Sequence, residues 1–168
     1  MKKIWLFSLY FLVQIDLFAN GTYQQEREII YFESYKEPGS ILIKTDERAL
    51  YYILGADLAY RYPIAVGKNH HQFFGTYPIS RKVKWPAWRP TRNIRRENPS
   101  LPAVVRGGAR NPLGARALYL GNSPFRIHGT NNPNSIGKAV SHGCIRMYNT
   151  DVKELYKMVD YGAMVYVE

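Results

Sequence analysis

The only cysteine of the chain, Cys144, stands between His142 and Arg146 in a polar stretch that spans residues 141–149. A thiol attacks carbonyl carbons as its thiolate, and a free cysteine is mostly protonated at neutral pH because its pKa is about 8.5. A base, a cation or backbone N–H groups lower that pKa, and this stretch can supply all three. If Cys144 begins a strand, it shares a face with Arg146 while Ile145 points into the core. The pattern favours a thiol nucleophile; the alternative is a small buried hydrophobic residue.

A second histidine, His128, lies 16 residues before Cys144, at the end of the alternating run Phe125-Arg126-Ile127-His128. Two strand ends joined by a loop rich in Gly, Asn and Pro can lie side by side, so His128 is the predicted general base. The alternative is an ordinary half-buried strand residue. The backbone N–H groups of Gly143 and Cys144 are the predicted oxyanion hole, and Ser141 and His142 are expected to shape the loop.

These residues form a recognisable signature. His128-Gly129-Thr130, followed by Ser141-His142-Gly143-Cys144-Ile145-Arg146-Met147, closely resembles the active site of the L,D-transpeptidases of bacterial cell walls, the YkuD-type catalytic domain. The similarity extends from about residue 40 to residue 167, and it includes Asn111-Pro112-Leu113-Gly114, Ala117-Leu118-Tyr119-Leu120, Asn149 and Asp151. One departure is Gln72-Phe73-Phe74-Gly75, where relatives often have Thr-Pro-Thr-Gly.

The resemblance implies a peptidoglycan L,D-transpeptidase that takes a tetrapeptide stem as acyl donor and makes 3-3 cross-links. Cys144 would form a thioester, His128 would move the proton, and the Gly129 carbonyl would orient the imidazole. Arg146 would hold either the loop or a substrate carboxylate. Water as acceptor would instead give an L,D-carboxypeptidase, and a lysine amine would give lipoprotein attachment. A carbapenem is expected to acylate Cys144, and no cofactor or metal is expected.

The remaining pattern predicts a mainly β domain, sandwich-like or barrel-like, with one clear helix near the C-terminus. Ile41–Lys44 and Ala49–Ile53 flank a short polar turn and read as a hairpin. Helical spacing follows residue 149, with Asn149 as the expected cap and Gly162 as the expected stop. The resemblance to the transpeptidase fold implies the same fold class.

The N-terminus reads as an export signal. Residues 1–19 combine a basic start, a short apolar run and a small residue, Ala19, at the end. We therefore expect a signal peptide at 1–19, an N-terminal extension at 20–39 and the catalytic domain at 40–168. The protein is expected in the periplasm or cell envelope as a monomer, with a membrane tether only if the signal is not cleaved. A single unpaired cysteine in an exported chain suggests a reactive thiol.

Positive charge gathers around the predicted site: residues 58–150 hold 15 Lys and Arg but a single acid, Glu97. Such a field attracts polyanions, and the polyanion outside the cell is the cell wall rather than nucleic acid. The segment Arg81–Arg96, with Trp85 and Trp88 among its basic residues, could also be a solvated face without a ligand. A non-catalytic wall-binding protein is the alternative from another class. A thiol redox protein would need a second cysteine, and the pair His70-His71 lacks the further ligands of a metal site.

Overall fold

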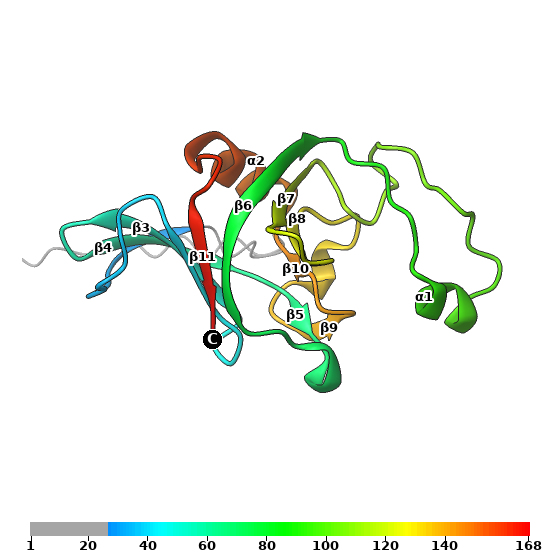
Figure 1. Ribbon diagram of the computed structural model, residues 1–168, viewed down its shortest axis with the longest axis horizontal. Helices are drawn as coiled ribbons and strands as arrows, with labels where there is room; N and C mark the ends of the chain where they lie inside the picture. Colours follow the sequence, from blue (N-terminus) through cyan, green and yellow to red (C-terminus); the bar gives the residue numbers. More distant parts are fainter. Residues whose placement is uncertain (1–26) are drawn as a thin grey trace, which may run out of the picture.

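The computed structural model describes residues 27–168, and within this range the chain is mainly β. Nine strands form one mixed sheet in the order β1-β4-β3-β2-β11-β6-β7-β8-β10, and β5 pairs with β9 apart from it (Figure 1). The clear helix near the C-terminus is α2. The predicted fold class is therefore confirmed.

The elements have the following bounds. The strands are β1 Glu28–Tyr31, β2 Ile41–Lys44, β3 Ala49–Gly55, β4 Leu58–Pro63, β5 Val66–Gly67, β6 Gly75–Lys84, β7 Arg116–Leu120, β8 Arg126–His128, β9 Ala139–Ser141, β10 Ile145–Arg146 and β11 Met164–Val167. The α-helices are α1 Arg92–Glu97 and α2 Asn149–Met158, and the short 3₁₀ turns are η1 Asn69–His71 and η2 Pro133–Ser135.

The predicted hairpin is present: β2 and β3 pair antiparallel, with Ile43 opposite Leu50. The last strand, β11, then joins the two halves of the sheet, because it runs parallel to β2 on one side and antiparallel to β6 on the other. Part of the expected N-terminal extension also belongs to the sheet, since β1 pairs antiparallel with β4 as its edge strand.

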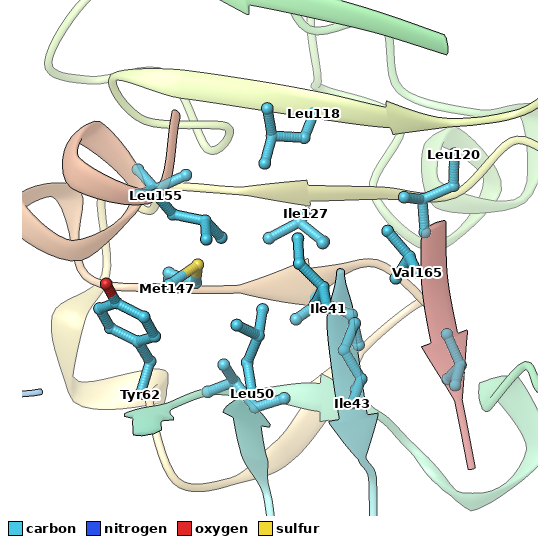
Figure 2. Close-up of a cluster of buried hydrophobic side chains, with 14 of the residues drawn as sticks. Ile41, Ile43, Leu50, Tyr62, Leu118, Leu120, Ile127, Met147, Leu155 and Val165 are labelled. Atoms are coloured by element: carbon cyan, nitrogen blue, oxygen red, sulfur yellow. The ribbon is translucent and has the colours of Figure 1, made fainter. Parts of the chain in front are cut away.

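One apolar layer separates two parts of this bent sheet. Figure 2 shows Leu118 of β7, Ile127 of β8 and Met147 meeting Leu50 of β3, with Leu155 of α2 closing the layer from the side. All five side chains are fully buried. Burying each such side chain stabilises the fold by about 1.5–3 kcal/mol. The alternation of apolar and polar residues along β8 and β10 therefore gives these strands two different faces. One face packs into the core, and the other carries the polar side chains of the candidate site.

A long excursion, residues 85–115, leaves the sheet between β6 and β7 and carries the short helix α1 (Figure 1). Its base is closed by backbone bonds, with the Trp85 N–H donating to the Ala115 carbonyl at 2.9 Å and Trp88 bridging Val105. The Asn111 amide donates to the carbonyls of residues 86, 105 and 106, each at 3.0 Å. The helix α1 was not predicted, since it has no buried residue and so no apolar period.

The predicted signal peptide, residues 1–19, lies outside the described residues. None of the helices between residues 27 and 168 is long and apolar enough to cross a membrane.

Candidate active site

The pairing of two short strands sets the segments that carry the predicted nucleophile and base next to each other. β8 and β10 run parallel, with Ile127 opposite Ile145 and His128 opposite Arg146. Cys144 immediately precedes β10 and is partly exposed, while His128 is buried. Because successive side chains alternate across a strand, His128 and Arg146 occupy the face opposite the buried pair Ile127 and Ile145. The same register sets Cys144 beside Arg126, so His128 lies two residues further along β8 from the position next to the thiol.

The imidazole of His128 is held in one tautomer. Its Nδ1 lies 2.5 Å from the carbonyl oxygen of Gly129, which can only accept, so Nδ1 carries the proton and Nε2 is left as the acceptor. Burial lowers the pKa of His128 to about 3; the bond to Gly129 raises it, and the nearby charges of Arg146 and Arg126 lower it further. The ring is therefore neutral at physiological pH and able to take a proton through Nε2.

The thiol is also neutral in the resting protein. Burial raises the pKa of Cys144, and the opposing effects of the Arg126 guanidinium, the Arg126 backbone N–H and the Arg146 guanidinium are smaller. We expected a base, a cation and backbone N–H groups to lower this pKa, and the cation and the N–H do act in that direction. Desolvation of the thiolate outweighs them, because a buried anion loses more hydration than these groups return. The resting pair is thus a thiol and a neutral imidazole.

The turn before Cys144 is held by Ser141. Its hydroxyl donates to the Cys144 carbonyl at 2.6 Å and accepts the Gly143 N–H at 3.0 Å. The Gly143 amide thus donates to Ser141 here, and the role of the Gly143 and Cys144 amides as an oxyanion hole stays a prediction. The Cys144 N–H has no acceptor among the described residues and remains a candidate donor. Gly143 itself needs to be glycine, because its φ is +114° and a Cβ would lie 2.8 Å from the Phe125 ring.

The side chain of His142 contacts the excursion. It is exposed, its Nε2 lies 3.0 Å from the Glu97 carboxylate, and its ring meets the ring of His71 edge-on, with centroids 5.4 Å apart. The hydrogen bond with His142 lowers the pKa of the Glu97 carboxyl group. Sequence reasoning did not find this pair, because 45 residues separate the two side chains. The only acid of the basic segment 58–150 thus ties α1 to the site loop.

Asn149 fastens the loops behind His128. Its amide donates to the Thr130 carbonyl at 2.7 Å, and its oxygen accepts the Ala115 N–H at 2.9 Å. The prediction that Asn149 caps the helix was wrong: α2 begins at Asn149, its cap residue is Tyr148, and no side chain caps it. The carboxamide is engaged across the strands instead. Gly129 must be glycine for this reason, since a Cβ there would lie 2.2 Å from the Asn149 oxygen.

Two arginines accompany the thiol and the imidazole. Arg146 was a predicted site residue; its backbone exchanges two 2.9 Å bonds with Ala65, and burial lowers the pKa of its guanidinium. Arg126 was not predicted, although it lies in the quoted run before His128. In the described part of the chain neither arginine forms an ion pair with a carboxylate. Between residues 27 and 168, no three His, Cys, Asp or Glu side chains gather as a metal site would require.

Comparison with known proteins agrees with this geometry. The family model of the YkuD L,D-transpeptidase catalytic domain matches residues 38–167. The chain is 33% identical over 162 residues to "Probable L,D-transpeptidase ErfK/SrfK" of Salmonella typhimurium, covering 91% of this chain and 52% of that protein. It spans about half the length of the curated relatives that it matches.

Solved structures give the same fold. An L,D-transpeptidase from Mycobacterium smegmatis superposes with a TM-score of 0.60 at 19% identity, covering 76% of this chain and 57% of that one. A chain from Brucella melitensis, described as a "Probable carnitine operon oxidoreductase caia", superposes with a TM-score of 0.58 at 40% identity, covering 83% of this chain and 91% of that one. With a family model that covers most of its length, this chain belongs to the YkuD family of L,D-transpeptidase catalytic domains.

Proposed function

We propose that the protein is a peptidoglycan L,D-transpeptidase that works through a thioester on Cys144 and joins two stem peptides by a 3-3 cross-link. The observation that supports the proposal is the parallel pairing of β8 with β10, because it sets the strand of His128, whose Nδ1 is tied to Gly129, next to the segment that carries Cys144. Envelope location follows from the family, because its members act on the cell wall. Export through residues 1–19 is part of the proposal.

The acylation step starts from the neutral pair. Nε2 of His128 takes the proton of the Cys144 thiol as the sulfur attacks the carbonyl carbon, so an imidazolium exists only during the step. The new C–S bond forms, the carbonyl electrons move to oxygen, and the Cys144 N–H is the candidate donor to that oxyanion. Losing one such donor costs an acyl-transfer enzyme about 3 kcal/mol. The C–N bond then breaks, and the leaving amine receives the proton from His128.

Deacylation runs the same steps in reverse with a new nucleophile. The amine of a second stem peptide loses its proton to Nε2 of His128 and attacks the thioester, and the sulfur leaves as the thiol. Water in the same place would give an L,D-carboxypeptidase, and a lysine side chain would give attachment of a lipoprotein. These three outcomes share the acyl-enzyme and differ only in the acceptor.

A redox function is suggested by the word "oxidoreductase" in the name of the Brucella melitensis chain. The residues of this chain do not favour it, because Cys144 is the single cysteine and thiol–disulfide exchange within one chain needs two. We therefore propose acyl transfer alone.

The test follows the fate of the acyl group. Purified protein is incubated with tetrapeptide-stem muropeptides, and the products are identified by mass spectrometry. Cross-linked dimers are expected; tripeptides without dimers would support the carboxypeptidase instead. Cys144→Ala should give neither product, and a carbapenem should add one covalent adduct to the wild type and none to this variant. Binding of muropeptides without any product, together with no adduct, would leave a wall-binding protein and sink the enzyme proposal.

A further inference from the structure

Arg126 occupies the position next to Cys144 across two paired strands. The parallel register sets Ile127 opposite Ile145, so Arg126 and Cys144 are the residues one step earlier on each chain segment. Arg126 alternates with Ile127 and therefore shares the face of His128, away from the core. On its other side Arg126 lies opposite Tyr119 of β7, and Tyr119 lies opposite Arg81 of β6. A row of polar and aromatic side chains thus leads across the sheet to the thiol.

The two arginines act on different members of the pair. Of the charged groups, Arg126 has the larger effect on Cys144 and Arg146 the smaller, while for His128 the order is reversed. The strand register gives the same picture, since Arg146 is the direct partner of His128. Arg126 therefore belongs to the thiol end of the site, and Arg146 belongs to the imidazole end.

The guanidinium of Arg126 has donors to spare. One terminal nitrogen, Nη2, donates to the Pro124 carbonyl at 3.0 Å, and the group lies 5.2 Å from the centre of the Tyr119 ring. Its Nε is shielded from solvent and has no partner among the described residues. Among residues 27–168 no carboxylate forms an ion pair with it, and Glu97, the only acid in residues 58–150, contacts His142 instead. A half-buried cation without a counter-ion is costly to the fold, and such groups are kept where they bind an anion.

The position of the leaving group in the proposed reaction indicates which part of the donor peptide lies near Arg126. The leaving amine must receive its proton from His128, so the leaving group lies toward the imidazole end of the site. Arg126 aligns with Cys144, two residues before His128 on β8, and its bond to Pro124 directs it further from the imidazole end. It therefore faces the part of the donor that stays on the sulfur, which we name the retained acyl half.

We propose that Arg126 is a specificity-determining residue that binds a free carboxylate on the retained acyl half of the donor peptide. This inference rests on the function proposed above. The carboxylate has two possible sources in a stem peptide: the side chain of the residue whose carbonyl is attacked, or the residue before it. Arg126 takes no part in the bond changes. It makes charge-assisted bonds that bring the anionic donor to Cys144 in the correct orientation.

The experiment compares donors that differ by one charge. Four synthetic tetrapeptides carry a carboxylate or a carboxamide at each of the two sources, and release of the C-terminal amino acid is measured for wild type, Arg126→Gln, Arg126→Lys and Arg81→Gln. The readout is the ratio of kcat/KM between the acid and amide donors. This ratio cancels any change in thiol reactivity, which affects both donors equally. Arg81→Gln is the matched control, because Arg81 contacts the same ring at 3.8 Å but lies on β6, which is separated from β10 by β7 and β8.

Wild type and Arg81→Gln should prefer the acid donor by about 10-fold to 100-fold, the usual value of a hydrogen-bonded charge pair. Arg126→Gln should bring the ratio close to one, and Arg126→Lys should retain part of it. The donor at which the preference disappears identifies the source of the carboxylate. An unchanged ratio in both Arg126 variants would overturn this inference while leaving the transpeptidase in place. Failure of the wild type to release the amino acid from any donor would overturn the proposed function and this inference with it.

Discussion

The protonation states of two side chains define how this site works. The pKa of the Cys144 thiol is raised and the pKa of the His128 imidazole is lowered, so the two groups form no ion pair at rest. In the mechanism that we propose, proton transfer therefore accompanies the attack. This arrangement protects an isolated thiol from adventitious electrophiles until a substrate carbonyl is in place. It also has a measurable signature in the absence of any substrate.

The first prediction concerns the reactivity of Cys144. Alkylation by iodoacetamide should be slower than that of glutathione at pH 7, because burial raises the pKa of this thiol. The rate should rise about tenfold per pH unit from about pH 6 to about pH 8.5, since only the thiolate reacts. Intact-mass measurement over time gives the rate, and Cys144→Ala gives the background. A plateau below pH 7 would reveal a resting thiolate and contradict the neutral pair.

The second prediction concerns the acid stability of the fold through His128. Its pKa in the folded protein is about 3, below the ordinary value of 6.5 that the unfolded chain has. The unfolded state therefore binds a proton first as the pH falls, and stability is lost between pH 6.5 and pH 3. Wild type should lose about 3 kcal/mol more than His128→Gln between about pH 7 and about pH 4. Urea unfolding of both proteins at the two pH values measures this; equal losses would show that folding does not lower the pKa of His128.

Short elements hold the site, and long-range bonds hold those elements. β8 has three residues and β10 has two, which is too little pairing to fix a geometry unaided. The loops at their ends are fastened by Asn149 from the start of α2, and the turn before Cys144 is fastened by Ser141. The helix thus contributes to the site through the backbone of its neighbours rather than by touching a substrate.

The third prediction concerns the hydrogen bonds of the Asn149 side chain. Asn149→Ala removes the partner of the Ala115 N–H and of the Thr130 carbonyl, and each orphaned backbone group costs about 1–3 kcal/mol if it is shielded from water. A loss of about 2–4 kcal/mol in the free energy of unfolding is expected. The exposed Asn122 makes no side-chain bond within the described residues, so Asn122→Ala is the matched control and should change stability by less than about 0.5 kcal/mol. Equal losses of unfolding free energy in the two variants would contradict a role of the Asn149 side chain in holding these loops.

Positive charge is unevenly distributed along the chain. The segment from residue 58 to residue 150 holds 15 Lys and Arg against one acid, a net charge of +14, which exceeds the +10 of the whole chain. It includes the excursion with α1 and both strands of the site (Figure 1). Fields of this kind raise the encounter rate of an anionic partner over distances of about a Debye length, which is about 10 Å at 0.1 M salt and about 3 Å at 1 M.

The fourth prediction follows from that distribution. For donors with free carboxylates, kcat/KM should fall severalfold between about 0.1 M and about 1 M salt, chiefly through KM. Donors with all carboxylates amidated should change little over the same range. Steady-state kinetics with both donors gives the comparison. An equal fall for the two donors would indicate a general salt effect on the enzyme instead of long-range attraction.

The local sequence was sufficient for most of the fold, while the roles of Cys144 and His128 stay predictions. Alternation and turn residues are encoded by neighbours in the chain, which is why the β2–β3 hairpin and β8 were predicted near their observed positions. The helix α1 was missed because an exposed helix shows no apolar periodicity in its sequence. Asn149 was misassigned because the same side chain can cap a helix or bond to the backbone of distant loops, and here it does the latter.

What the chain alone determined is the family signature and the strands that carry it, and it predicted Cys144 as the nucleophile and His128 as the base. The folded arrangement then fixed the protonation state of Cys144, the contact of Glu97 with His142 and the position of Arg126 beside the thiol. The physical reason is that desolvation and ion pairing depend on which groups meet in space, and here those groups come from segments as far as 45 residues apart.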